Sequence, residues 1–252
     1  MTDGAATGGA ATDGAAMDGA AMDGAAVGVR DLTVHLGGRA VLHGVTFRPR
    51  PGALTALCGP NGAGKSTLLR ALAGLLPGGR PRPRRVAYVE QGARCAWGLT
   101  VAQVAALGRI PHGDADPAPI ERALRACGVA ALRDARVDRL SGGQARRAML
   151  ARAFATEPEV LLLDEPTADL DPAAAHDCMA LLRRTAREGR TVVAVLHALD
   201  LASRYADRAV VLDDGRVVAD APPLDALPAA AAAFGLPWGT DPAPRLLPPG
   251  PP

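Results

Sequence analysis

Aromatic residues, lysine and asparagine are scarce in this sequence. Aromatics make up 3% of the 252 residues, Lys65 is the single Lys among 28 Lys and Arg, and Asn61 is the single Asn. No apolar run approaches the ~18–20 residues that cross a bilayer. The N-terminus has no basic start followed by an apolar stretch. We therefore expect neither a transmembrane helix nor a secretory signal.

Net charge and cysteine spacing argue against a nucleic-acid-binding protein and against a disulfide-bonded one. A net charge of +2 gives no strong electrostatic footprint for nucleic acid, so no nucleic-acid partner is expected. The four cysteines show no CxxC spacing, which is typical of free thiols in a reducing compartment. They are Cys58, Cys95, Cys127 and Cys178.

The chain divides into a low-complexity start, a patterned middle and a Pro-rich end. Residues 1–26 repeat a unit close to Asp-Gly-Ala-Ala, which buries too little apolar area to order itself, so we predict a disordered tail. Residues 27–225 are predicted to form one domain, and 226–252 a Pro/Ala-rich tail. Within the domain, the patterns predict strands at 29–34, 41–47, 53–58, 86–90, 160–163, 191–196 and 209–212. Helices are predicted at 65–75, 100–108, 117–133, 144–154 and 173–187. This alternation favours an α/β fold with a mainly parallel sheet covered on both faces, and about 93–145 form an inserted helical subdomain.

A phosphate-binding loop is predicted between the strand at 53–58 and the helix at 65–75. Residues 59–66 fit the pattern GxxxxGK[ST] in the strand–loop–helix context that this motif requires. Glycines let backbone N–H groups face a phosphate chain, the Lys adds a point charge, and the Ser hydroxyl suits Mg²⁺. The alternative is a glycine-rich turn that carries Lys-Ser by chance. The predicted nucleotide contacts here are Gly59, Pro60, Asn61, Gly62, Ala63, Gly64, Lys65, Ser66 and Thr67.

Two carboxylates end the apolar strand at 160–163. Acids at this end of a strand lie in the crevice where α/β sheets bind ligands. Asp164 is predicted to hold Mg²⁺, and Glu165 to act as general base on water. A solvated acidic turn is the alternative, and the upstream phosphate loop makes it the weaker one.

Short motifs in a fixed order carry a family resemblance. Residues 140–144 read Leu-Ser-Gly-Gly-Gln, 89–91 read Val-Glu-Gln, 168–171 read Ala-Asp-Leu-Asp, and His197 ends the strand at 191–196. With the phosphate loop and Asp164-Glu165, these resemble the signature, Q-loop, D-loop and switch histidine of ATP-binding cassette (ABC) ATPases. The resemblance covers nearly all of 27–225. It implies a RecA-like P-loop NTPase core with an N-terminal antiparallel β part and an inserted helical subdomain.

The resemblance also implies roles for individual residues. It gives Glu165, His197 and Gln91 catalytic roles, and it assigns Mg²⁺ to Ser66, Gln91 and Asp164. ABC cassettes work as head-to-tail dimers, so the signature loop of one subunit would close over the ATP of the other. That loop and the D-loop would add nucleotide contacts from Ser141, Gly142, Gly143, Gln144 and Asp171.

Three positions depart from the family pattern. Leu36, beside His35, stands where members often stack adenine on an aromatic ring. Ala198 replaces the Asp that often follows the switch histidine, although Asp200 is near. The run 80–85 is Arg- and Pro-rich, and we interpret it as a solvated loop rather than a contact for lipid or nucleic acid.

Two further stretches indicate an importer. Residues 97–101 and 107–112 resemble ATPases that import ferric siderophores, haem and cobalamin. The resemblance implies a homodimer on the cytoplasmic face of the membrane, a separate permease contacted near Trp97 and Arg109, and indirectly a solute-binding protein. Zinc or manganese import, a soluble ABC ATPase such as one in iron–sulfur assembly, and a non-catalytic nucleotide-binding regulator are the alternatives.

Overall fold

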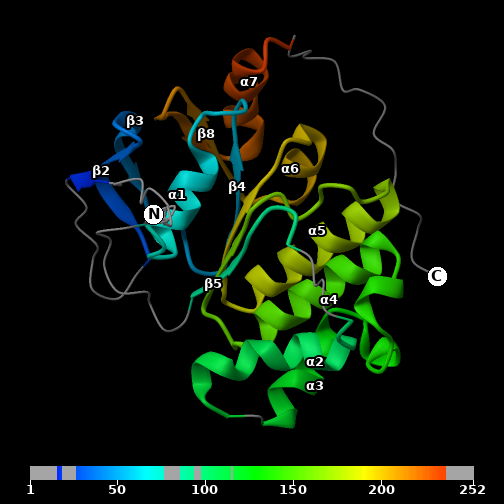
Figure 1. Cartoon of the computed structure of the whole chain (residues 1–252). Helices are drawn as coiled ribbons and strands as arrows, with labels where there is room; N and C mark the ends of the chain where they lie inside the picture. Colours follow the sequence, from blue (N-terminus) through cyan, green and yellow to red (C-terminus); the bar gives the residue numbers. More distant parts are fainter. Residues whose placement is uncertain (1–15, 19–26, 77–85, 94–97, 115, 237–252) are drawn as a thin grey trace, which may run out of the picture.

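The computed structural model describes residues 16–18, 27–76, 86–93, 98–114 and 116–236 (Figure 1). A six-stranded sheet with the order β5-β6-β7-β4-β8-β9 lies at its centre. Its strands are β4 (Leu54–Cys58), β5 (Val86–Val89), β6 (Val160–Leu163), β7 (Thr191–Val195), β8 (Arg208–Asp213) and β9 (Arg216–Ala221). All neighbours run parallel except β8 and β9, which confirms the predicted mainly parallel sheet. The ends of β4, β5, β6 and β7 therefore meet at one edge.

A second, antiparallel sheet forms the N-terminal part, as the resemblance implied. It consists of β1 (Ala16–Asp18), β2 (Val29–Leu36) and β3 (Arg39–Phe47). The prediction of disorder over 1–26 does not hold for residues 16–18, which pair with β2 between Thr33 and His35. The physical reason is that a sheet edge offers unpaired backbone groups, and pairing with them requires no apolar side chains. The rest of 1–26 lies outside the described residues.

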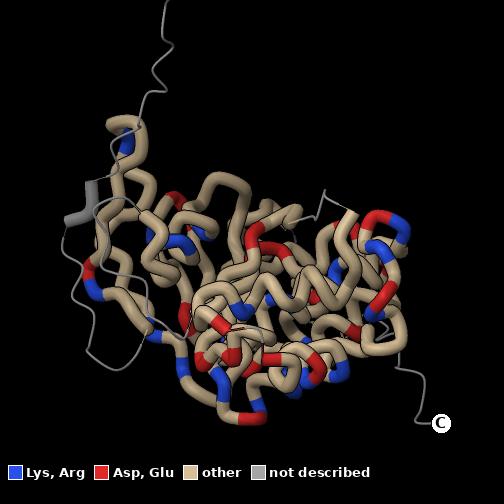
Figure 2. Tube along the Cα trace, turned by 60° about the horizontal axis from the view of Figure 1, so that its bottom comes forward, with Lys and Arg blue, Asp and Glu red and all other residues tan. Residues whose placement is uncertain are grey.

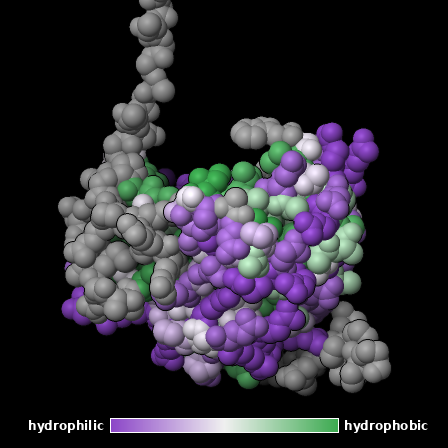
Figure 3. All heavy atoms as spheres, turned by 90° about the horizontal axis from the view of Figure 1, so that it is seen from below, coloured by the Kyte–Doolittle hydropathy of each residue, from purple (hydrophilic) through white to green (hydrophobic). Residues whose placement is uncertain are grey.

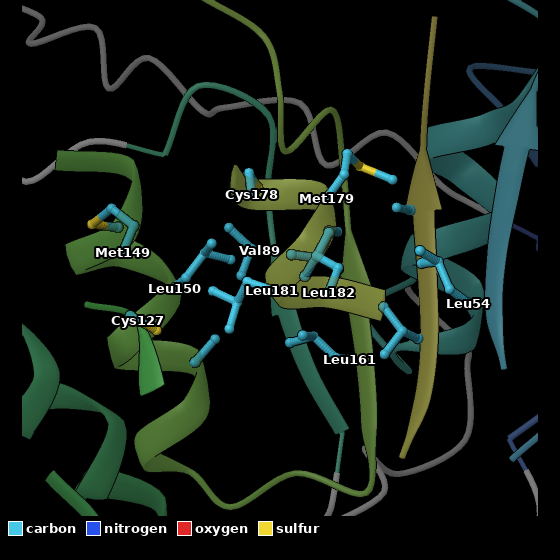
Figure 4. Close-up of a cluster of buried hydrophobic side chains, with 14 of the residues drawn as sticks. Leu54, Val89, Cys127, Met149, Leu150, Leu161, Cys178, Met179, Leu181 and Leu182 are labelled. Carbon is cyan, nitrogen blue, oxygen red and sulfur yellow. The ribbon is translucent and has the colours of Figure 1, made fainter. Parts of the chain in front are cut away.

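Helices cover the two faces of the central sheet. A large cluster of buried side chains lies between one face and the helices α4 (Gly142–Ala155) and α5 (Pro172–Arg187). Leu150 of α4, Leu182 of α5 and Leu161 of β6 converge there (Figure 4). A second cluster joins the other face to α1 (Lys65–Leu72) and to β2 and β3. Each buried leucine contributes about 1.5–3 kcal/mol, so these layers hold the strand ends in place.

The predicted helical insertion is present. It contains α2 (Val101–Ala106), a 3₁₀ helix (Leu107–His112) and α3 (Pro117–Ala126) before α4. Thr100 starts α2 with a capping box, because its hydroxyl accepts from the Gln103 amide while the Gln103 side chain accepts from the Thr100 amide. Helix 117–133 was predicted too long, since α3 ends at Ala126 and Gly128 follows with a positive φ.

The C-terminal part is more ordered than predicted. α6 (Leu199–Tyr205), β9 and α7 (Pro223–Ala233) were not expected, and the proposed tail 226–252 does not hold for residues 226–233. The prolines indicated a loop, but Pro222 and Pro223 stand at the start of the helix, where Pro needs no N–H partner, and the Ala run after the internal Pro228 has high helix propensity. Ala226, Leu227 and Ala230 are buried, so α7 packs onto the domain.

The surface carries mixed charges. Basic and acidic residues are interspersed along the trace in Figure 2, and the described part of the face seen from below is mostly hydrophilic (Figure 3). Among the described residues, no helix combines the length and apolar character that a bilayer span requires.

Candidate active site

The phosphate loop follows β4, whose five residues are all buried. Gly59 leaves this strand with φ +137°, and a Cβ there would lie 1.9 Å from the Leu212 carbonyl oxygen. Gly64 has φ +94°, and its Cβ would lie 2.6 Å from a methyl group of Leu42. Both positions thus exclude any side chain. Glycine at position 59 is thus required by close backbone approach as well as by its backbone conformation, whereas Gly62, with φ +83° and no heavy atom within 4 Å of an added Cβ, is required by its conformation alone.

The start of α1 is open to an anion. Gly64 caps this helix without any side-chain hydrogen bond to its first-turn amides. Such amides, together with the helix dipole, attract negative charge. Ser66 and Thr67 lie in this first turn. The arrangement fits the phosphate chain of a nucleotide.

Lys65 turns back over the loop that carries it. Its Nζ donates to the carbonyl oxygens of Gly59 at 2.8 Å and Pro60 at 2.7 Å, and the residue is 6% exposed. Burial lowers the pKa of Lys65, while the nearby Glu165 and Asp164 carboxylates offset part of this effect. The ammonium group therefore binds the start of its own loop and lies within electrostatic range of the two acids that follow β6.

Asp164 follows β6 and is almost inaccessible, at 1% exposure. Its Oδ2 accepts a hydrogen bond from the Tyr88 hydroxyl at 3.3 Å, whereas Oδ1 is buried and has no hydrogen-bond partner. A buried carboxylate oxygen without a donor is costly unless a cation or water satisfies it. The residues therefore fit a Mg²⁺ ion, for which carboxylate and hydroxyl oxygens are suitable ligands.

Glu165 is the centre of the predicted catalytic group. One carboxylate oxygen, Oε2, accepts from Gln91 Nε2 at 2.8 Å, and the other, Oε1, lies 2.8 Å from His197 Nε2. These contacts join the loops after β5, β6 and β7. Glu165 has φ +50°, a left-handed conformation that is uncommon for a residue with a side chain. The structure thus brings together the three predicted catalytic residues.

The signature loop lies elsewhere on the domain. Ser141 caps α4: its hydroxyl accepts from the Gln144 amide, and the Gln144 side chain accepts from the Ser141 amide. Cβ atoms at Gly142 and Gly143 would lie 3.7 Å from the Asp169 carbonyl oxygen and 3.1 Å from the Ala174 Cβ. The signature loop therefore packs beside the D-loop of its own chain.

Asp171 has a structural role that the motif did not indicate. Its Oδ1 accepts from the Ala174 amide at 2.8 Å and caps α5. The predicted contact between Asp171 and nucleotide remains a prediction.

Arg109 does not form the surface contact expected of it. It is 5% exposed, and its guanidinium donates to Asp114, to Glu157 and to the Ala155 carbonyl oxygen. Arg109 stabilises the helical subdomain from inside, because a buried guanidinium needs all its donors paired. Trp97 and the run 80–85 lie outside the described residues.

Sequence reasoning missed three residues at the site. Tyr88 contacts Asp164, Arg146 bonds the backbone around Glu165, and the Phe234 ring lies 6.3 Å from the His197 ring, centroid to centroid. Tyr88 lies on β5, just before the Q-loop. A Tyr in an otherwise apolar strand could have indicated that its hydroxyl has a polar partner at the site. Nothing local marked Phe234, because it belongs to a segment interpreted as a tail.

A glycine-lined phosphate loop at the carboxyl edge of a parallel sheet, with an Asp-Glu pair two strands away, is typical of P-loop nucleotide-binding proteins. Residues 42–168 match the ABC transporter family. The chain is 43% identical over 211 residues to the cobalamin import ATP-binding protein BtuD of Halobacterium salinarum, covering 75% of this chain and 53% of that protein. It is 42% identical over 217 residues to the hemin import ATP-binding protein HmuV of Rhodococcus jostii, covering 78% and 74%.

A solved structure, cbiO1 from Clostridium perfringens, described as part of the ABC transporter complex cbiONQ, has a TM-score of 0.70 and 28% identity. The match covers 79% of this chain and 90% of that one. The chain belongs to the ABC transporter family. The predicted family and fold class are confirmed. This chain spans about half the length of the Halobacterium protein.

Proposed function

We propose that the chain is the ATP-hydrolysing subunit of an ABC importer that energises uptake of a metal chelate through a separate membrane permease. The observation that carries this proposal is the position of Glu165. Gln91 and His197 hold its two oxygens, and Lys65 and Asp164 stand beside it as charged neighbours. Phosphoryl transfer to water requires a general base, a cation that binds the phosphates and a carboxylate that binds the metal ion, and Glu165, Lys65 and Asp164 can fill these roles.

The residues divide the chemistry among them. Lys65 and the amides at the start of α1 would bind the β- and γ-phosphates, while Ser66, Asp164 and Gln91 would hold Mg²⁺. When bound, Mg²⁺ neutralises charge on the phosphates. Glu165 would orient the attacking water and accept its proton. A carboxylate has about four lone-pair positions, so its bonds to Gln91 and His197 leave room for that water.

A homodimer would complete the site. Ser141 and the amides at the start of α4 form a second anion-binding end, which packs beside the D-loop of its own chain. We propose that this end closes over ATP held by a second copy of the chain. ATP would stabilise the closed dimer and ADP would not, and this difference in binding would drive the permease between its two orientations. The chain would act at the cytoplasmic face of the membrane.

The solute proposal rests on sequence similarity. The relatives named above are hemin and cobalamin import ATP-binding proteins, and a ferric siderophore, haem or cobalamin belongs to the same class of metal chelate. A zinc or manganese importer and a soluble ABC ATPase of iron–sulfur assembly stay as alternatives, and no contact in the structure favours either.

The test of catalysis is ATP turnover by the wild type and by Glu165→Gln, with and without the permease. The amide keeps the size of Glu165 but cannot accept the proton, so we expect kcat to fall by at least about 100-fold while ATP binding persists. Glu188→Gln, an exposed substitution at the far end of α5, serves as the control. A wild type that binds ATP and never hydrolyses it, even with its permease, would instead support a nucleotide-binding regulator.

The solute is tested in the assembled transporter. ATPase stimulation would be measured with haem, cobalamin, ferric siderophores, zinc and manganese, each presented with the solute-binding protein. If only zinc or manganese stimulated ATP turnover, the metal-chelate proposal would be wrong and a zinc or manganese importer would be supported.

A further inference from the structure

Arg146 lies between two motifs of the site. It belongs to α4, five residues after Ser141, and is 8% exposed. Because α4 is continuous from Gly142 to Ala155, Arg146 and the signature loop are parts of one rigid element. A displacement of the signature loop therefore also moves the backbone that carries Arg146.

The guanidinium of Arg146 binds the turn that carries the catalytic base. Its Nε donates to the Pro166 carbonyl oxygen at 2.9 Å, and an Nη donates to the carbonyl oxygens of Glu165 at 2.6 Å and Asp164 at 3.4 Å. Three consecutive carbonyl groups thus share one planar donor. These bonds offset the cost of burying the charge.

The turn needs such support. Glu165 has φ +50°, a left-handed conformation that is unfavourable for a residue with a Cβ. Strained backbone persists where its surroundings fix it, and the bonds from Arg146 fix the carbonyl groups before, at and after Glu165. The direction of the Glu165 side chain therefore depends on where α4 places Arg146.

We propose that Arg146 is a positioning residue that couples the signature loop of each subunit to the Glu165 of the same chain. When Ser141 engages ATP bound by the other subunit, α4 shifts, and Arg146 transmits the shift to the turn of Glu165. The base of one site thereby senses whether the opposite site is closed. This inference rests on the proposed function, because it requires a hydrolysing dimer.

The experiment is a double-mutant cycle on ATP turnover with Arg146→Lys and Ser141→Ala. Lysine keeps the charge but cannot span three carbonyl groups with one ammonium. We expect Arg146→Lys to lower kcat at least about 10-fold and to change KM less than about twofold, since the phosphate loop is untouched. Arg152→Gln, on the same helix, is the matched control and should keep the wild-type kcat.

The cycle separates coupling from structural support. If Arg146 transmits engagement of Ser141, the double variant loses little more than the stronger single variant. Two losses that multiply would overturn the proposal, because they would show independent effects. A folded Arg146→Lys with wild-type kcat would overturn it as well.

Folding is monitored by thermal unfolding, and Arg146→Gln provides a second, neutral variant. If both variants are unfolded at the assay temperature, Arg146 acts in stability and the coupling proposal is overturned. A wild type without ATPase activity would overturn the proposed function together with this inference. An active wild type with multiplicative losses would overturn the inference alone.

Discussion

Substituting Gly59 by Ala tests whether close backbone approach, rather than turn geometry alone, requires glycine in the phosphate loop. Gly59 leaves β4 with φ +137°, and its missing Cβ would lie 1.9 Å from the Leu212 oxygen and 3.0 Å from the Leu212 carbonyl carbon. Both are backbone atoms of β8, which pairs directly with β4. Neither can rotate away, so relief requires the two strands to separate or the loop to shift.

The expected loss has two parts. A conformation nearly exclusive to glycine costs about 1–3 kcal/mol for alanine, and overpacking in a tight interior costs about 1–3 kcal/mol more. Gly59→Ala should therefore lower the free energy of unfolding by about 2–6 kcal/mol. Gly62→Ala is the matched control in the same loop, because it has φ +83° and no heavy atom within 4 Å of the added Cβ. It should lose only about 1–2 kcal/mol.

The assay is urea unfolding of the wild type and both variants, followed by binding of a fluorescent ATP analogue. Displacement of Gly59 also moves a carbonyl that Lys65 contacts, so Gly59→Ala should weaken nucleotide binding as well. Equal unfolding free energies for the two variants would refute the reasoning, because they would show that the contact with Leu212 carries no cost.

Two further predictions concern other contacts. Tyr88→Phe removes the hydroxyl that donates to Asp164, a hydrogen bond worth about 1 kcal/mol. The affinity for Mn²⁺ in the presence of ATP, measured by titration, should therefore fall several-fold. An unchanged Mn²⁺ affinity would contradict this role of Tyr88. Arg109 holds the pKa of Asp114 at about 2, below its ordinary 3.8. Because the folded-state pKa is lowered, the stabilisation is present above pH 3.8 and is lost as pH falls towards 2. Carboxyl titration by NMR should show this shift in the wild type and not in Arg109→Gln.

The sequence predicts where the phosphate loop and the Asp164-Glu165 pair lie, because each motif directly follows a strand. β4, the glycine loop and α1 follow one another without interruption, and β6 runs directly into Asp164-Glu165. In both places an apolar run predicts a buried strand. The residues that follow it in sequence must then lie at the carboxyl end of that strand. The order of the strands in the sheet, in which β7 separates β6 from β4, is known only from the structure.

Contacts between distant segments escaped prediction. Tyr88 reaches Asp164 from the neighbouring strand, and Phe234 reaches His197 from α7, so neither follows from spacing. Arg109 was expected at the permease contact because of the family resemblance, although it is 5% exposed and its guanidinium donates to three acceptors of its own chain. α7 was missed because its prolines were weighed more heavily than the alanines after them. Helix propensity and charge are properties of a residue type and can be read from the sequence. Burial depends on neighbours that only the folded chain brings together.

The sheet order also has a consequence during protein synthesis. β4 carries the phosphate loop, yet its sheet partners are β7 and β8, and Leu54 pairs with Val192. The loop thus leaves the ribosome long before the strands that support it exist, and the nascent chain holds β4 without a neighbour. Non-local pairing of this kind is slow and exposes apolar strands. A ligand of the phosphate loop can therefore stabilise the folded sheet only after β7 and β8 have emerged.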